Sequence, residues 1–280
     1  MKYSVRIGLK KALVYTVSFV LCVTSVMPFL VMFVNASREN YDIQQGISLI
    51  PGNMLKENMQ TLRDRQNFNV ARGMWNSFQV AGLSTVLALY FSTLTAYGLV
   101  VYSFRLRKAA FTLIMATMMI PTQVSIVGFF TFMFRMGLTN TYWPLTIPAI
   151  ASPTVVFFMR QYMLTALPLE MVEAARIDGS SEFNTFNRIA LPLMKPALAT
   201  QAIFIFIGSW NRLFEPTMLI SSQDKYTMPM LVALLRSDRF RTDYGTVYLA
   251  LSLTVLPLIV VYLLLSKHII RGVALGGVKE

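Results

Sequence analysis

The sequence predicts an all-α integral membrane protein, with residues 1–280 forming a single transmembrane domain of six transmembrane helices. Hydrophobic residues make up 55% of the 280-residue chain and charged residues only 14%, whereas soluble domains carry about 25% charged residues. A helix needs about 20 residues to cross a hydrocarbon layer about 30 Å thick. The chain has six apolar stretches of this length, at 12–34, 76–104, 109–134, 140–163, 197–220 and 246–266.

The first stretch, 12–34, predicts a membrane anchor that is retained. Four basic residues precede it, as in a signal peptide, but its 23 residues exceed the apolar core of about 7–15 residues that a signal peptide has. Its Cys22 is the only cysteine of the chain, and His268 is the only histidine. The chain therefore offers neither a disulfide framework nor a Cys-based or His-pair metal site, and we expect no metal.

The distribution of charge predicts that both termini are cytoplasmic. With the N-terminus inside, the inner segments, counted together with Arg160 near the inner end of the fourth stretch, hold 14 basic and 5 acidic residues, and the outer segments hold 10 basic and 7 acidic residues. Cytoplasmic loops of membrane proteins carry the excess of Lys and Arg. A membrane surface therefore explains the net charge of +12, and we expect no nucleic-acid partner.

Seven prolines lie inside or at the edges of the apolar stretches: Pro28, Pro121, Pro144, Pro148, Pro153, Pro216 and Pro257. Proline in a helix interior removes a backbone hydrogen bond and kinks the helix. We expect helices that are kinked but continuous. The alternative is broken intramembrane helices, which are tolerated where neighbours or a water-filled cavity satisfy the freed carbonyls.

Two segments between the apolar stretches are long. The outer segment, 35–71, exceeds the usual length of a plain loop, which predicts short helices or a docking surface there. The inner segment, 165–195, predicts a hairpin of two short helices. We expect its first helix to begin near Pro168 and to end at Gly179, a residue that adopts the left-handed C-cap conformation.

The second helix of the hairpin is predicted to start at a serine cap, Ser180 or Ser181, and to end at Pro192. Apolar residues recur at helical spacing in both helices. They are Leu169, Val172 and Ala175 in the first helix, and Phe183, Phe186, Ile189 and Ala190 in the second. So small a hairpin cannot bury this face by itself, so the face rests either on the chain's own membrane helices or on another protein.

The hairpin also carries a definite motif. It is made of Glu173, Ala174, Ala175, Asp178, Gly179, Phe186, Ile189, Leu191 and Pro192. These residues at this spacing closely resemble the EAA motif of permease subunits in binding-protein-dependent ABC importers.

Further matches extend the resemblance over nearly the whole chain, to the second membrane subunit of the maltose-type carbohydrate permeases. They are Ile50-Pro51 with Glu57-Asn58, Asn76-Ser77, Gly137-Leu138 with Asn140-Thr141, and Trp210-Asn211 with Pro216. The tail RGVALGGVKE is similar to the family's basic, glycine-rich ending, although Gly277 and Glu280 replace the more usual Ala and Gly.

The resemblance implies the fold of a type I ABC importer permease, in which the hairpin is the element that couples to an ATPase. Glu173 would contact an ATP-binding subunit, Gly179 would permit the turn, and Phe183 and Phe186 would supply a hydrophobic plug. The implied partners are a homologous second permease subunit, a dimer of ATP-binding subunits and an extracytoplasmic sugar-binding protein. The implied location is a cytoplasmic (inner) membrane of bacterial or archaeal type.

The chain itself is expected to be non-catalytic and to bind no cofactor. A Walker A loop needs a Gly-Lys dipeptide, because its backbone amides cradle the phosphates that the lysine reaches. The chain contains no Gly-Lys dipeptide. ATP and Mg would therefore be bound by the partner ATPase subunits.

Charged residues in the fifth apolar stretch are candidates for the translocation path. Arg212 and Glu215 are three positions apart, close enough to pair on one helix. Charged residues within a membrane default to a functional role. The alternative is a structural ion pair near the outer interface, with Arg212 reaching toward the headgroups.

Four uncharged residues are further candidates for the path. Trp210 and Asn211 suit a sugar, because an aromatic ring stacks on sugar CH faces and an amide bonds to hydroxyls. They equally suit the aromatic belt of a membrane protein. Gln123 and Gln201 either line the path or form hydrogen bonds between helices.

These observations predict a permease subunit of an ATP-driven importer for a sugar or oligosaccharide, with a glycerol phosphate derivative as the other substrate class. An ion- or proton-coupled secondary carrier, with Arg212 and Glu215 as coupling charges, is the alternative. A helical membrane scaffold without transport is a third class.

Overall fold

The computed structural model describes residues 2–65, 68–237 and 243–277, and these residues include helices but no strand. The described part divides into two compact units. Unit 1 consists of residues 1–70 and 232–256, and unit 2 of residues 71–231 and 257–280. The prediction of one transmembrane domain over residues 1–280 stays a prediction.

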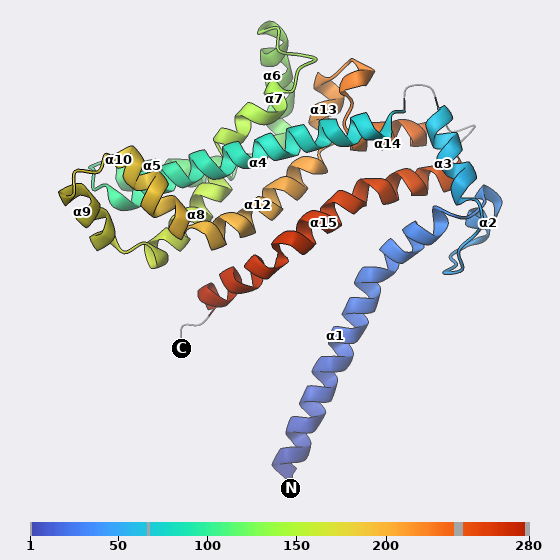
Figure 1. Ribbon diagram of the computed structural model, residues 1–280, viewed down its shortest axis with the longest axis horizontal. Helices are drawn as coiled ribbons and strands as arrows, with labels where there is room; N and C mark the ends of the chain where they lie inside the picture. The colour runs from blue at the N-terminus through green and yellow to red at the C-terminus, as the bar shows by residue number, and fades with distance from the viewer. Residues whose placement is uncertain (1, 66–67, 238–242, 278–280) are drawn as a thin grey trace. The chain divides into compact units, whose positions relative to one another are not determined.

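Unit 1 begins with a long helix, α1 (Lys2–Asn35), drawn in blue in Figure 1. The side chains of its apolar stretch, Lys11–Asn35, are almost all exposed. Two short helices follow, α2 (Asn40–Gln45) and α3 (Leu55–Asp64). The prediction that the segment 35–71 contains short helices is therefore confirmed, and its place outside the membrane stays a prediction.

Asn58 of α3, a buried amide, joins α3 to the turn that follows α1. Its side chain donates hydrogen bonds to the carbonyl oxygens of Ala36 at 3.0 Å and Arg38 at 3.3 Å. Gly245, at the start of α15 (Tyr244–Gly277), approaches the same amide. A Cβ atom at Gly245 would lie 2.6 Å from the Asn58 side-chain nitrogen, so only glycine fits this contact.

Unit 2 is organised around α4 (Val70–Val101), a helix of 32 residues. The chain continues through α5 (Arg107–Thr117), α6 (Thr122–Arg135), α7 (Trp143–Thr146), η1 (Ile147–Ile150) and α8 (Pro153–Ala166). It then forms α9 (Leu169–Ile177), α10 (Glu182–Thr185), η2 (Phe186–Ala190), α11 (Leu191–Leu193), α12 (Lys195–Trp210), α13 (Phe214–Leu219) and η3 (Gln223–Lys225). The last helix before α15 is α14 (Met228–Ser237).

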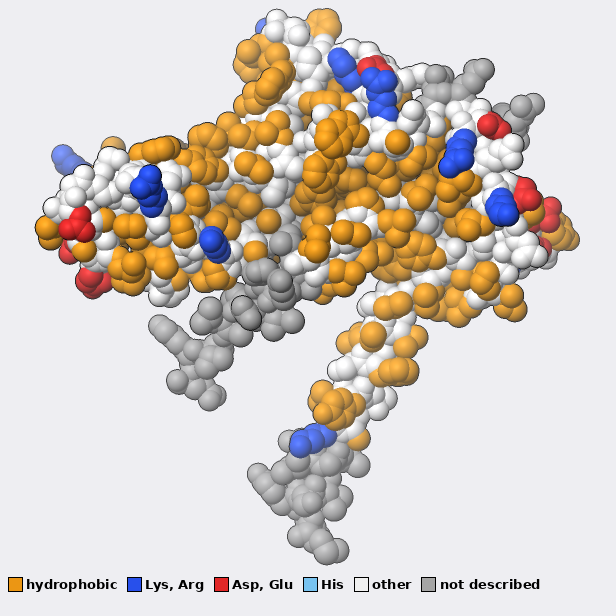
Figure 2. Space-filling view, in the orientation of Figure 1, with side chains coloured by type: hydrophobic (Ala, Val, Ile, Leu, Met, Phe, Trp, Pro, Cys, Tyr) orange, Lys and Arg blue, Asp and Glu red, His pale blue; other side chains and the backbone are white. Residues whose placement is uncertain are grey.

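The largest apolar core of unit 2 joins α4 to α8 and to the hairpin segment. Tyr97 of α4, Met159 and Met163 of α8, and Phe186 of η2 are all buried in it. In Figure 1, α9 and α10 lie beside the end of α4 that leads into α5. Figure 2 shows hydrophobic side chains over much of the visible face of unit 2, as expected for a surface in contact with lipid.

Three described helical segments are long and apolar enough to cross a membrane: Lys11–Asn35, Val70–Val101 and Tyr244–Leu264. They coincide with the predicted spans 12–34, 76–104 and 246–266. Two pairs of helices, bent by 80° and 79°, raise the number of candidate spans to five. The chain is therefore a multi-pass membrane protein, and the count of six spans stays a prediction.

The other three predicted spans are not continuous helices. The stretch 109–134 divides between α5 and α6, 140–163 divides between α7, η1 and α8, and 197–220 divides between α12 and α13. The expectation of continuous helices is wrong for these stretches.

Proline explains the breaks. Pro121 is the N-cap of α6, and Pro144, Pro148, Pro153 and Pro216 lie in the first turns of α7, η1, α8 and α13. Proline lacks an N–H group and has a fixed φ, so it suits the first turn of a helix better than an interior position. Of the seven prolines, Pro28 and Pro257 alone lie inside long helices.

Candidate functional site

The turn of the hairpin is built as the sequence predicts. The helix α9 starts after Pro168 and has Asp178 as its C-cap, and Gly179 follows with a φ of 79°. The Ser180 N–H donates to the carbonyl of Ala175 at 2.9 Å, and the Gly179 N–H donates to that of Arg176 at 3.0 Å. This pair of bonds is a Schellman motif, which satisfies the last carbonyls of a helix.

The second half of the hairpin differs in part from the prediction. Ser181 is the N-cap, and its hydroxyl oxygen accepts a hydrogen bond from the Asn184 N–H at 3.4 Å. Pro192 does not end the helix, because the chain passes through the π turn η2 and stays helical to Leu193.

The apolar residues of the hairpin do not all share one face. Phe186 and Ala190 are buried, Ile189 is half-buried, and Phe183 is 67% exposed. A step of three residues leaves two side chains of an α-helix about 60° apart. Of the two phenylalanines, only Phe186 belongs to the buried core. The prediction that Phe183 shares the face of Phe186 is wrong. Of the two residues that the resemblance implies as a hydrophobic plug, only Phe183 is accessible to a partner, because Phe186 is enclosed by its own chain.

The hairpin therefore has a packed face and an exposed remainder. The packed face lies on the chain's own core through residues such as Val172 and Ala175. We call the remaining surface the uncovered face, and its largest exposed hydrophobic side chains are Leu169, Met171, Ile177 and Phe183. Glu173, Ala174 and Asp178 of the motif are exposed as well.

A charged cluster joins the two helices of the hairpin to the end of α4. The Arg176 Nε donates to the Glu182 Oε1 at 2.6 Å, and the Tyr102 hydroxyl donates to Oε2 at 2.6 Å. The Tyr97 hydroxyl donates to the same Oε2 at 3.3 Å. We call these four residues the Glu182 cluster.

Hydrogen bonds set the ionisation of the Glu182 cluster. The bond from Arg176, followed by that from Tyr102, holds the pKa of Glu182 below its usual value. Burial, together with the bond to Glu182, raises the pKa of the Tyr102 phenol. At neutral pH the carboxylate is therefore charged and the phenol keeps its proton, the two states that the hydrogen bond between them requires.

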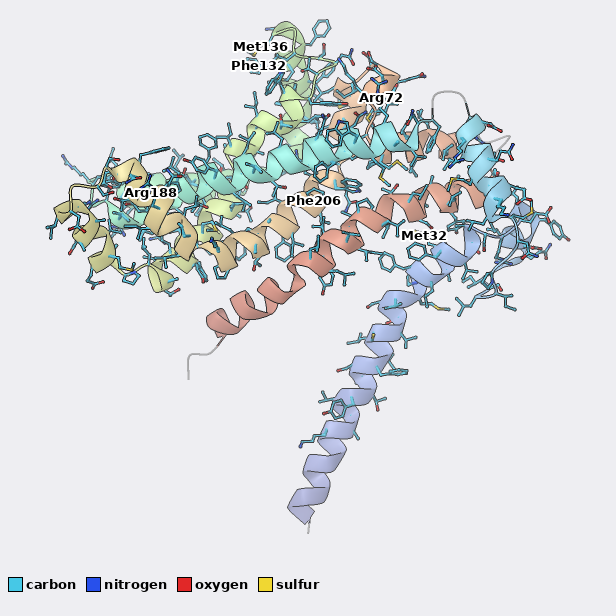
Figure 3. All side chains as sticks on the ribbon, viewed as in Figure 1. Met32, Arg72, Phe132, Met136, Arg188 and Phe206 are labelled. Atoms are coloured by element: carbon cyan, nitrogen blue, oxygen red, sulfur yellow. The ribbon has the colours of Figure 1, made fainter. Side chains whose placement is uncertain are left out.

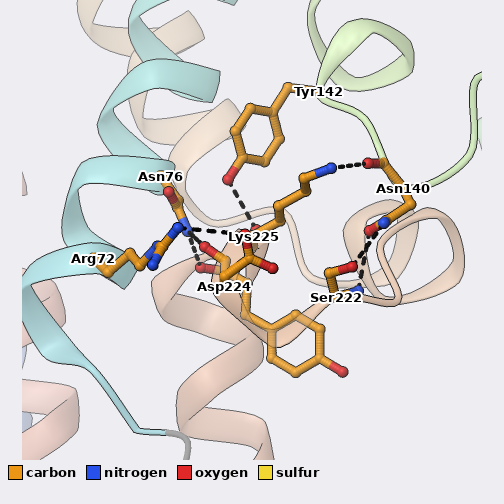
Figure 4. A network of polar contacts seen from close by, with 8 residues as sticks. Arg72, Asn76, Asn140, Tyr142, Ser222, Asp224 and Lys225 are labelled. Atoms are coloured by element: carbon orange, nitrogen blue, oxygen red, sulfur yellow. Dashed lines mark hydrogen bonds and ion pairs between the residues drawn. The ribbon is translucent and has the colours of Figure 1, made fainter.

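A second polar network lies at the opposite end of α4 and holds the segment 219–226 (Figure 4). The Asn76 amide donates to the carbonyls of Asp224 and Tyr226, at 2.9 Å each. Arg72 forms an exposed ion pair with Asp224 at 3.3 Å. Asn140 and Tyr142 complete the network, with the Lys225 ammonium donating to the Asn140 carbonyl at 2.7 Å and the Tyr142 hydroxyl donating to the Lys225 carbonyl at 3.2 Å.

The structure separates the predicted charge pair of the path. The helix α12 ends at Trp210, and Asn211, Arg212 and Leu213 lie between it and α13. Arg212 is exposed, Glu215 is half-buried, and the described residues include no ion pair between them. The prediction that they pair on one helix is wrong, because the helix breaks before Arg212.

The four uncharged candidates fall in different environments. Trp210 is 2% exposed and stacks on Phe206, with ring centroids 5.6 Å apart. Gln201 is buried in α12, whereas Asn211 is exposed. The side chain of Gln123 lies outside the described residues. The three residues whose side chains the structure describes therefore differ in their exposure.

With this geometry established, comparison with known proteins identifies the family. Residues 88–275 match the family described as the binding-protein-dependent transport system inner membrane component. The chain belongs to this family. The matched range holds the second part of α4, the whole hairpin and α12 to α14, so the Glu182 cluster is built within it.

Curated relatives and a solved structure resemble this permease over most of its length. It is 34% identical over 262 residues to the arabinooligosaccharide transport permease AraQ of Halalkalibacterium halodurans, covering 91% of each chain. It is 35% identical over 251 residues to the sn-glycerol-3-phosphate transport permease UgpE of Pectobacterium atrosepticum, covering 88% of this chain and 89% of that one. A chain of a bacterial ABC transporter that imports alginate shares the fold, with a TM-score of 0.79 at 21% identity, covering 94% of this permease and 96% of that chain.

Sequence reasoning missed the Glu182 cluster of this permease. Arg176 and Glu182 lie within the EAA segment, but Tyr97 and Tyr102 lie about 80 positions earlier in the chain. Nothing in their local pattern marks these two tyrosines as partners of the hairpin. Helix-end tyrosines next to a charged loop are the one signal that could have drawn attention to them.

Proposed function

We propose that this permease is the second membrane subunit of an ATP-driven importer for a sugar or oligosaccharide, and that its hairpin, 165–195, seats on an ATP-binding subunit. The observation that carries the proposal is the uncovered face of the hairpin. Ile177 is 86% exposed and Phe183 is 67% exposed at the tip of a segment whose Val172 and Phe186 are buried against the chain's own core. Exposed apolar side chains gathered on a small element mark a protein-binding surface.

In the proposed complex, Phe183 enters the ATPase surface, while Glu173 and Asp178 supply charged contacts around it. Ala174 leaves room for close approach, and the Gly179 turn fixes the angle of the two helices. The buried residues Ala175, Phe186 and Ile189 support this surface from behind, together with the Leu191-Pro192 turn. The exposure of the first group and the burial of Ala175 and Phe186 support this division of roles.

The further proposed partners are a homologous permease subunit, a dimer of ATP-binding subunits that hold ATP and Mg, and an extracytoplasmic sugar-binding protein. The membrane is the inner membrane of a bacterial or archaeal-type cell, crossed six times with both termini in the cytoplasm. In this topology the hairpin lies on the cytoplasmic side, and the network of Figure 4 lies on the outer side. The chain supplies no catalytic residue of its own.

The proposed path residues are Trp210, Asn211, Arg212, Glu215, Gln123 and Gln201. The break between α12 and α13 supports a role for Asn211 and Arg212, because an irregular backbone within a membrane protein is tolerated where it lines a cavity. Trp210 is enclosed within the chain and supports this break through its stacking on Phe206.

The sugar is the first substrate class because the relatives include an arabinooligosaccharide permease. Glycerol phosphate is the second, since another relative at 35% identity is a glycerol-3-phosphate permease. Arg212 favours glycerol phosphate, because an exposed cation at a helix break is suited to bind a phosphate.

The test is uptake into proteoliposomes that contain the permease with its co-purified partners. We expect uptake of arabino-oligosaccharide to require internal ATP and the ATP-binding subunit and to survive ionophores. Uptake of glycerol 3-phosphate in its place would select the second substrate class. Uptake that collapses with ionophores and ignores ATP would instead establish a secondary carrier, and an assembled complex without uptake of either solute would indicate a scaffold.

A further inference from the structure

The hairpin is attached to α4 by two unlike contacts, one helical turn apart. At Phe186 the contact is apolar, with its ring 5.7 Å from that of Tyr90 and 5.4 Å from that of Tyr97, measured between centroids. At Glu182 the contact is the polar cluster described above. A hollow of about 200 Å³ lies between the two contacts, lined by Leu94, Tyr97, Gly98, Tyr102, Glu182, Phe183 and Phe186. The hairpin is therefore held on the Glu182 side by hydrogen bonds instead of close packing.

The carboxylate of Glu182 receives donors from three separate segments. Arg176 belongs to α9, Tyr97 belongs to α4, and Tyr102 follows directly after α4. The Arg176 guanidinium also lies over the Tyr102 ring, 5.5 Å from its centroid. Hydrogen bonds to an ionised group are about twice as strong as neutral ones, and a cation above a ring adds to them.

The same helix is fixed at its other end to the segment 219–226. Asn76 and Tyr97 are 21 positions apart on α4, which corresponds to about 32 Å at 1.5 Å per residue. This is close to the thickness of the hydrocarbon layer, about 30 Å. In Figure 3, Arg72 near Asn76 and Arg188 in the hairpin lie at opposite ends of unit 2. One continuous helix thus joins the hairpin to the loop segment that Asn76 holds.

We propose that Glu182 is a positioning residue that makes the hairpin and α4 move as one body, so that a displacement of the hairpin is transmitted along α4 to the segment 219–226. The source of that displacement, an ATPase bound to the hairpin, rests on the proposed function. The attachment of the hairpin to α4 through Glu182, which we call the clamp, does not rest on the proposed function. Without the carboxylate, the hairpin would stay attached at Phe186 and would pivot about it into the hollow beside Phe183.

The carboxylate is suited to this role because it is an acceptor on both oxygens. A glutamine at position 182 keeps one acceptor and presents an amide donor in place of the other, so it loses the charge and either the arginine or the tyrosine bond. Tyr102→Phe removes one hydroxyl but keeps the ring beneath Arg176. Tyr162→Phe is the matched control, since Tyr162 packs on the same core and its hydroxyl is not part of the cluster.

The first experiment measures the clamp directly in the purified complex without nucleotide. In a Cys22→Ser background, Glu170→Cys on the hairpin and Thr95→Cys on α4 provide two exposed positions for spin labels. We expect a narrow distribution of label distances in the parent and in Tyr162→Phe, and a broadened one in Glu182→Gln and Tyr102→Phe. An unchanged distribution in Glu182→Gln would overturn the clamp, whatever the chain transports.

The second experiment measures transmission, as solute taken up per ATP hydrolysed in proteoliposomes, with arabino-oligosaccharide as the probe. We expect Glu182→Gln to keep ATP hydrolysis and complex assembly while this ratio falls by about two- to thirtyfold, the range of typical coupling effects. Arg176→Ala should add little to Glu182→Gln, because the two act through one bond. If uptake, ATP hydrolysis and complex assembly all fell together in Glu182→Gln, Glu182 would be only a structural residue. Absence of ATP-dependent uptake in the parent would refute the proposed function and leave the label experiment intact.

Discussion

Asn140 and Ser222, 82 positions apart in the chain, are joined side chain to side chain. The Asn140 amide donates to the Ser222 hydroxyl at 2.7 Å, and its carbonyl oxygen accepts from the Ser222 N–H at 3.0 Å. Asn140 is also the non-glycine residue with a positive φ, 58°, among the described residues. It therefore fixes the loop before α7 to the loop after α13 with both its backbone and its side chain.

We predict that Asn140→Ala destabilises the permease more than Asn140→Gly does. Both changes remove the side-chain bonds, each worth about 1 kcal/mol, but a left-handed backbone costs an alanine about 1–2 kcal/mol more. The measurement is the apparent melting temperature of the purified protein in detergent. Equal melting temperatures for the two variants would show that the backbone conformation at Asn140 contributes nothing.

We predict that Gly179→Val weakens the hairpin, whereas Gly179→Asn is tolerated. Nothing lies within 4 Å of a Cβ atom built at Gly179, so the cost of a side chain there is conformational. Asparagine adopts the left-handed conformation at little cost, and a β-branched residue does not. Co-purification of the ATP-binding subunit measures the effect, and retention of the subunit by Gly179→Val would contradict the prediction.

Phe183 and Phe186 should separate binding from stability. We expect Phe183→Ser to reduce co-purification of the ATP-binding subunit while leaving the melting temperature of the permease unchanged, because Phe183 is 67% exposed. Phe186→Ala should lower the stability by about 3–5 kcal/mol, since it empties a core position. If Phe183→Ser left the complex intact, the uncovered face of the hairpin would not be the ATPase contact.

As the pH falls, the hydrogen bonds of the Glu182 cluster should persist until the pH is below the usual pKa of a glutamate. The pKa of Glu182 is lowered in the folded chain, first by the bond from Arg176. The stabilisation is therefore present above the unfolded value and lost as the pH falls through the folded value. The width of the spin-label distribution should stay constant from neutral pH down to the ordinary pKa of a glutamate, about 4.3, and should increase only below it. Broadening near pH 6 would implicate another group.

Arg212 and Glu215 should act independently. As a helix break lies before them and they form no ion pair, the effects of Arg212→Gln and Glu215→Gln on uptake should add within about 0.5 kcal/mol in a double-mutant cycle. A strong dependence of one change on the other would restore the pairing that the sequence predicts. It would also favour the secondary carrier, in which the two charges work together.

The sequence by itself determined the membrane character, the long helices and the hairpin with its turn. These depend on local physics: apolar runs of sufficient length, the left-handed freedom of Gly179, and a serine cap at Ser180 or Ser181. The tertiary structure alone decided where proline breaks a helix instead of kinking it, because that depends on which neighbours satisfy the freed carbonyls. It also decided that Phe186 is covered while Phe183 is not, and that Tyr97 and Tyr102 meet Glu182. Contacts between residues about 80 positions apart are set by how the helices pack, and no local pattern records that packing.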